Sequence, residues 1–71
     1  MNPLTKAQAR VLSYIKTHVK KNGYPPTRGE IAQHFGWASK TAAQQHLEAI
    51  QAKGQIRVAP GLSRGITICA A

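Results

Sequence analysis

Five residues between positions 39 and 45 have side chains suited to reading DNA bases, at spacings that place them on one surface of a helix. They are Ser39, Thr41, Ala42, Gln44 and Gln45. The major groove admits an α-helix, and its base edges pair with side-chain amides and hydroxyls. Glutamine suits adenine, whereas threonine suits a thymine methyl group or a hydrogen bond. The alternative interpretation is an ordinary solvent-exposed helix face. Gln44 and Gln45, considered without the rest of the chain, would favour that alternative.

A second set of residues is suited to holding the phosphate backbone: Thr27, Arg28, Lys40, Lys53, Ser63 and Arg64. Arg28 stands in the first turn of a predicted helix, where a positive charge opposes the helix dipole, and this suggests an external anion. Hydroxyl and N–H groups at helix starts also bind phosphate. Arg64 at a loop tip is usually just exposed, but on a wing it would meet phosphate or a minor groove.

The overall charge favours a polyanionic partner. The 71 residues contain 10 Lys and Arg but two acids, for a formal net charge of +8. Nucleic acid fits this balance, although a merely basic protein would show it too. A membrane surface would need a basic amphipathic helix with bulky apolar anchors, and the one candidate helix needs its apolar stripe for the core. We therefore expect double-stranded DNA as the partner and no membrane.

Catalysis, metals and cofactors find little support in the sequence. One acid, Glu30, is committed to helix capping, the serines have no evident base partner, and no phosphate loop or metal motif occurs. Cys69 is the single cysteine, and no two histidines stand three or four residues apart. No apolar run approaches the roughly 20 residues of a membrane span, and no signal peptide is evident. We expect a cytoplasmic, nucleoid-associated protein that is not an enzyme and uses no cofactor or small-molecule substrate.

The pattern of apolar residues predicts three helices that position the candidate residues. The first covers about 6–21 and the second about 28–35, each after a Thr that begins a capping box. The third, the recognition helix, covers about 40–53, with Ser39 as its N-cap and Gly54 closing it. Its apolar stripe begins one residue later than in the minimal helix-turn-helix, so we expect a longer turn at 36–38. The predicted inward residues are Val11, Leu12, Ile15, Val19, Ile31, Ala32, Phe35, Ala43, Leu47 and Ile50.

Two short alternating segments follow and predict a hairpin over 55–69, with Ile56, Val58, Ile66 and Ile68 inward. The chain is therefore predicted to be one domain, 1–71, mostly α with a small β-hairpin. This is a winged helix-turn-helix, with three helices plus a two-stranded antiparallel wing. Trp37 is interpreted as a lid on the core and Tyr24 as a packing residue.

Three stretches resemble the N-terminal DNA-binding domain of LexA repressors: Pro25 to Gln33, Ala42-Ala43 with His46-Leu47, and Gly61 to Ile66. The resemblance covers essentially the whole chain without gaps. It implies a repressor of DNA-damage (SOS response) genes that binds inverted-repeat operators. It also implies that Ser39, Thr41, Ala42, Gln44 and Gln45 face bases and that Arg28, Lys53, Ser63 and Arg64 lie near the backbone.

Two departures from the family bear on function. A well-known family form has Asn at position 41 and Glu at positions 44 and 45, so the preferred half-site is expected to differ here. The family's C-terminal half, with its Ser-Lys self-cleavage dyad and main dimer interface, is missing. We therefore expect a monomer in solution or a weak dimer on a palindromic site, and a free-standing relative from a phage or mobile element rather than an excised domain.

The predicted function is that of a sequence-specific transcriptional regulator, a LexA-like repressor with its third helix in the major groove. Two alternatives remain from the residues alone. One is a protein-interaction module that binds another regulator or polymerase, because winged helices serve that role too. The other is a non-specific DNA binder. Strong salt dependence of duplex binding would argue against the protein-interaction module.

Overall fold

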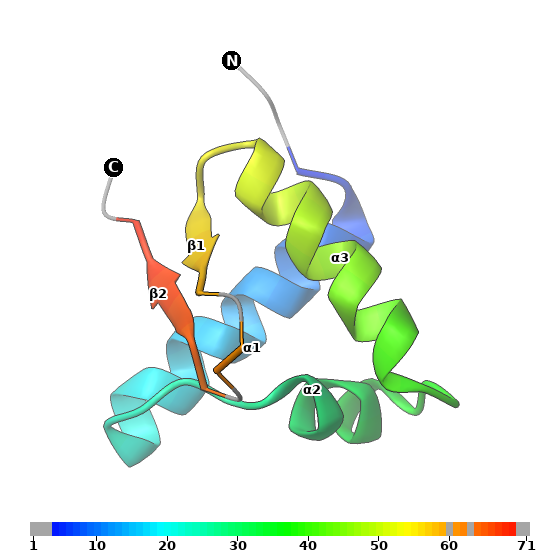
Figure 1. Ribbon diagram of the computed structural model, residues 1–71, viewed down its shortest axis with the longest axis horizontal. Coiled ribbons are helices and arrows are strands. Elements are labelled where there is room, and N and C mark those ends of the chain that lie inside the picture. Colours follow the sequence, from blue (N-terminus) through cyan, green and yellow to red (C-terminus); the bar gives the residue numbers. More distant parts are fainter. Residues whose placement is uncertain (1–3, 60, 63, 70–71) are drawn as a thin grey trace.

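Three helices and a two-stranded antiparallel sheet make up the fold in the computed structural model, which describes residues 4–59, 61–62 and 64–69. This confirms the predicted winged helix-turn-helix class. The elements are α1 (Lys6–Asn22), α2 (Arg28–Phe35), α3 (Lys40–Ala52), β1 (Ile56–Val58) and β2 (Ile66–Ile68). In Figure 1, α2 crosses the bottom, α1 passes behind α3, and the hairpin stands beside them.

The starts of α1 and α2 are fixed by the two predicted capping boxes. Thr5 accepts from the Gln8 N–H, and Thr27 accepts from the Glu30 N–H at 3.0 Å. Glu30 Oε1 in turn accepts from the Thr27 N–H at 2.8 Å. Such reciprocal bonds satisfy N–H groups that have no partner inside the helix. They set where α2 begins, and therefore where Arg28 projects.

The start of α3 confirms Ser39 as the predicted N-cap, whereas the end of α3 differs from the prediction. Ser39 precedes the helix with an extended backbone, but its side chain makes no capping hydrogen bond. At the other end the helix stops at Ala52, one residue short of the expected Lys53, and Lys53 rather than Gly54 is the capping residue. Gly54 follows with a φ of +78°, a left-handed conformation that glycine adopts without strain.

The core lies where the three helices and the sheet meet. Its buried residues are Val11, Leu12, Ile15, Ile31, Ala32, Ala43, Leu47, Ile50, Ile56 and Ile66. Four of the predicted inward residues, Val19, Phe35, Val58 and Ile68, are only half-buried and pack against this cluster. The stripe Ala43, Leu47 and Ile50 therefore faces α1 and α2, which leaves the opposite side of α3 for a partner.

The hairpin is short but tied to the helices. Its register pairs Ile56 with Ile68 and Val58 with Ile66, and Ile56 and Ile66 are the buried members of these pairs. The Val58 N–H also donates to the Gln51 side chain of α3. A two-stranded hairpin alone is marginal in water, so packing on the helices is what holds the wing in place.

Candidate nucleic-acid interface

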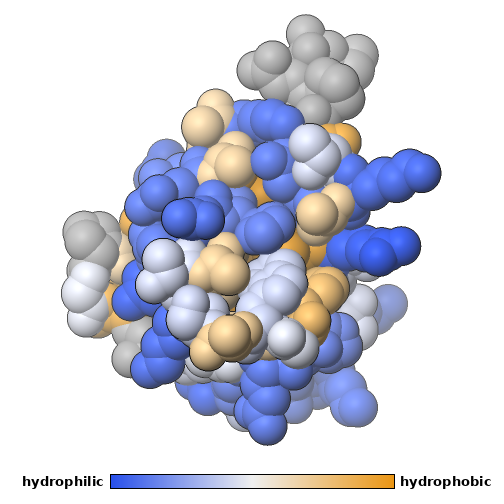
Figure 2. Space-filling view, turned by 90° about the vertical axis from the view of Figure 1, so that its right-hand side faces the viewer, coloured by the Kyte–Doolittle hydropathy of each residue, from blue (hydrophilic) through white to orange (hydrophobic). Residues whose placement is uncertain are grey.

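The outer face of α3 carries the predicted base-reading residues. Ser39, Thr41 and Gln45 are exposed there, whereas Ala42 and Gln44 are half-buried. Figure 2 views the molecule from the right-hand side of Figure 1. Outside the grey atoms, the surface seen there is mainly hydrophilic, with small apolar spots. Scattered apolar spots of this kind do not make the large contiguous patch that marks an apolar docking surface.

Gln44 lies at the centre of a hydrogen-bonded chain. Its Oε1 accepts from Arg28 Nη1 at 2.6 Å, and its Nε2 donates to Glu48 Oε2 at 2.8 Å. The position of Arg28 in the first turn of α2 suggests an external anion, but its partner in this structure is the side-chain amide of Gln44 in α3. A phosphate contact from Arg28 stays a prediction, since the guanidinium has five N–H donors and this bond uses one.

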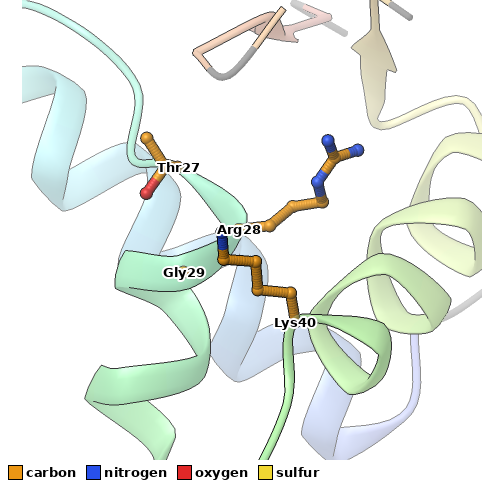
Figure 3. A pocket seen from close by; sticks show the side chains of 4 residues that line it. All are labelled: Thr27, Arg28, Gly29 and Lys40. Atoms are coloured by element: carbon orange, nitrogen blue, oxygen red, sulfur yellow. The ribbon is translucent and has the colours of Figure 1, made fainter. Parts of the chain in front are cut away.

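Thr27, Arg28, Gly29 and Lys40 surround a hollow of about 160 Å³ where α2 and α3 both begin. Figure 3 shows Lys40 reaching from α3 back toward the first turn of α2, while the Arg28 guanidinium points away from Thr27. The Lys40 Cε would lie 3.3 Å from a Cβ at position 29, so glycine there gives this side chain room. The hollow combines a hydroxyl, helix N–H groups and positive charge, which are the groups that bind phosphate.

Arg64 is held against α2 rather than left at the tip of the wing. Its Nη1 donates to Glu30 Oε1 at 2.7 Å and to the Pro25 carbonyl at 2.9 Å, and its Nη2 donates to Glu30 Oε2 at 3.1 Å. The guanidinium carbon also lies 4.6 Å from the centroid of the Tyr24 ring. Tyr24, although 46% exposed, therefore packs under this cation. Contact between Arg64 and DNA would require it to leave or share these partners.

The same contacts shift the pKa of the Glu30 carboxyl. Hydrogen bonds from Arg64 and from the Thr27 backbone, with the positive charge of Arg64, lower the pKa of Glu30 from 4.5 to about 2. A lowered pKa in the folded state means that the ionised carboxylate favours folding. Its contribution to stability is therefore present above about pH 4.5 and is lost as the pH falls toward 2.

We expect the substitution Glu30→Gln to flatten the loss of stability in acid. The free energy of unfolding, measured by urea denaturation at a series of pH values, should fall less between pH 4.5 and 2 in the variant than in the parent protein. Glu48→Gln is the matched control, because it removes the other acid but keeps the Arg64 contact. Parallel pH curves for the parent and Glu30→Gln would contradict this role.

The remaining predicted backbone residues are placed as follows. Lys40 is exposed, whereas Lys53 is half-buried and its Nζ donates to Gln8 Oε1 of α1 at 2.7 Å. Ser63 lies outside the described residues, so its predicted phosphate contact is not located. No helix in the described part of the chain is long and apolar enough to cross a membrane. The same residues contain no group of three or more His, Cys, Asp or Glu able to hold a metal ion.

Comparison with known proteins shows the family. The family described as LexA DNA binding domain matches residues 1–65. The chain belongs to this family. The LexA repressors of Pseudomonas chlororaphis and Pseudomonas aeruginosa PAO1 are 53% and 52% identical over 68 residues, and that of Pseudoalteromonas atlantica is 52% identical. The match covers 96% of this chain but 33–34% of each relative, so the chain spans about one third of their length.

Several contacts of this LexA-type domain were not foreseen from the sequence. Trp37 is half-buried and packs against the core, which confirms its predicted role as a lid, but it also stacks on His46 of α3, with ring centroids 4.5 Å apart. It also stacks on Phe35 of α2 at 5.0 Å, so the indole joins the two helices across the turn. The contact between Gln44 and Glu48 could have been predicted from their spacing, because residues four apart on a helix are neighbours.

Proposed function

We propose that the chain is a sequence-specific double-stranded DNA-binding domain of a LexA-like transcriptional repressor, with α3 in the major groove. The observation that carries this proposal is the arrangement of α3. Its apolar stripe is buried, its opposite face bears Thr41, Gln44 and Gln45, and a polar hollow lies where it meets the start of α2. Base-reading groups beside phosphate-binding groups are what groove recognition needs.

The family membership supports the finer parts of the proposal. The matched relatives are named LexA repressors, which supports repression, a role in the SOS response and a cytoplasmic location. We further propose that two copies occupy an inverted-repeat operator, either as monomers that meet on DNA or as a weak dimer. We also propose that the contacts with the phosphate backbone come from the hydroxyl and cationic residues predicted for them: Thr27, Arg28, Lys40, Lys53, Ser63 and Arg64.

Replacing both glutamines of the reading face tests this function. In the double variant Gln44→Ala, Gln45→Ala, affinity for a selected operator should fall by about tenfold or more, since each lost base contact removes roughly 1–3 kcal/mol of discrimination. Affinity for a random duplex should change little, because no cation is removed. Fluorescence anisotropy on both duplexes gives the two dissociation constants.

Equal losses on the operator and on the random duplex would contradict base recognition by α3. A protein that binds neither duplex at low salt would instead favour the protein-interaction alternative. The variant's far-UV circular dichroism and unfolding midpoint, compared with those of the parent, serve as the folding control.

A further inference from the structure

The side chain of Gln44 is clamped from two elements. Arg28 belongs to the first turn of α2, and Glu48 lies one turn further along α3. Figure 3 shows the Arg28 guanidinium extending away from α2 toward α3. With bonds of 2.6 Å to its oxygen and 2.8 Å to its nitrogen, the Gln44 amide has a partner at each end.

These partners determine which end of the amide is the oxygen. A guanidinium can only donate hydrogen bonds, and a carboxylate can only accept them. Arg28 therefore requires the Gln44 oxygen and Glu48 requires its NH2 group. An amide rotated by half a turn would place nitrogen against Arg28 and oxygen against Glu48, and both bonds would be lost. The clamp thus selects one orientation of the side chain before any ligand arrives.

Each amide atom keeps one further hydrogen-bonding position. The oxygen has a second lone pair and the nitrogen a second hydrogen, so one acceptor and one donor remain. In the major groove, adenine presents a donor and an acceptor at N6 and N7, whereas guanine presents two acceptors and cytosine one donor. We propose that the Arg28–Gln44–Glu48 chain positions Gln44 to read an adenine in each half-site. This inference rests on the proposed function, and it makes Arg28 and Glu48 positioning residues.

The neighbouring residue Gln45 provides an internal comparison. It is the same residue type on the same helix, but it is exposed, and its side chain makes no hydrogen bond with the part of the chain that the structure describes. Its amide can turn either way and present donor or acceptor as the base demands. The structure therefore assigns strict adenine selection to Gln44 and a more tolerant contact to Gln45.

The charge of Glu48 supports a positioning role. It is one of two acids in a chain of net charge +8, and it is exposed on the same helix as the predicted base-reading residues. A carboxylate beside DNA weakens binding by repulsion from the phosphates. The hydrogen bond from Gln44 to Glu48 explains why this charge is present. The carboxylate lowers the affinity for DNA of any sequence, but it fixes the orientation of the Gln44 amide.

Selection of bound sequences from a random duplex pool tests the inference. The parent protein should enrich adenine at one position of each half-site, by about 5- to 150-fold over the other bases. Gln44→Ala should abolish the preference at that position and leave the other positions enriched. Gln45→Ala, the matched control, should keep it. Replacing the selected adenine by 7-deazaadenine, which lacks the N7 acceptor, should weaken the parent by about fivefold and leave Gln44→Ala unaffected.

Two substitutions of Glu48 separate positioning from charge. Glu48→Gln and Glu48→Ala both remove the negative charge, so both should strengthen binding to a random duplex by a similar factor. The glutamine variant keeps an oxygen acceptor for Gln44 and should retain the adenine preference. The alanine variant frees the amide nitrogen, and the preference should fall by about fivefold or more.

The outcomes distinguish this inference from the proposed function. If a motif is enriched but Gln44→Ala keeps the adenine, or Glu48→Ala keeps the full preference, the inference is wrong and the proposed function stands. If the parent protein enriches no sequence, both are wrong. Unchanged unfolding midpoints in the variants show that the differences arise at the interface.

Discussion

Raising the salt concentration from about 50 to about 200 mM is expected to weaken the binding of two copies of this domain to an inverted-repeat operator by roughly a thousandfold. Each cation that neutralises a phosphate releases counterions and contributes about −0.9 to the slope of log affinity against log salt. Of the four cations proposed for the phosphate backbone, Arg28, Lys40 and Lys53 are counted here. Three from each copy make six, and six such contacts produce a loss of this size.

Arg64 is left out of this count because it is paired with Glu30 in the structure. A titration followed by fluorescence anisotropy at several salt concentrations gives the slope. Lys40→Gln should reduce its magnitude by about 0.9 per copy. Lys16→Gln, an exposed lysine of α1, is the control and should leave the slope unchanged, because α1 packs on the side of α3 away from the reading face. A slope near zero would contradict an interface with the phosphate backbone.

The second large effect is on stability. Leu47→Ala is expected to lower the free energy of unfolding by about 2–5 kcal/mol. Leu47 is fully buried in the middle of α3, so truncation removes apolar contacts and leaves a cavity between α3 and its neighbours. A domain of 71 residues has a total stability of roughly 4–10 kcal/mol. This single change therefore removes a large share of it.

Leu62→Ala is the matched control for this substitution. It is the same chemical change at a leucine that is 60% exposed, and surface changes usually stay within about 0.5 kcal/mol. Urea denaturation followed by far-UV circular dichroism measures both. Losses of equal size at the two positions would contradict the assignment of Leu47 to the core.

The helices and the hairpin were predictable because their signals are local. The Thr27–Glu30 capping box starts α2 through bonds that span three residues, and the spacing of Ala43, Leu47 and Ile50 defines the buried side of α3. The ends of α3 were less predictable. The capping bond expected of the Ser39 hydroxyl does not form, and chain geometry rather than residue type decides such a bond.

The partners of Arg28 and Arg64 were not predictable, because these contacts join elements distant in the sequence. Arg64 meets Glu30 across 34 positions and Arg28 meets Gln44 across 16. The chain has many more cations than acids. Which cation pairs with which acceptor depends on how the wing and α3 lie against α2, and the residue types alone do not predict that arrangement. The sequence therefore predicts phosphate contacts for Arg28 and Arg64 but does not reveal that both side chains also have partners within the protein.

The measurement that tests the central claim most directly is the ratio of two dissociation constants for the unmodified protein. One is for the duplex that it selects from a random pool, and the other is for a scrambled duplex of the same composition, both at physiological salt. A sequence-specific domain predicts tighter binding to the selected duplex by about a thousandfold or more. A ratio near one would contradict the proposal that the polar face of α3 reads DNA sequence.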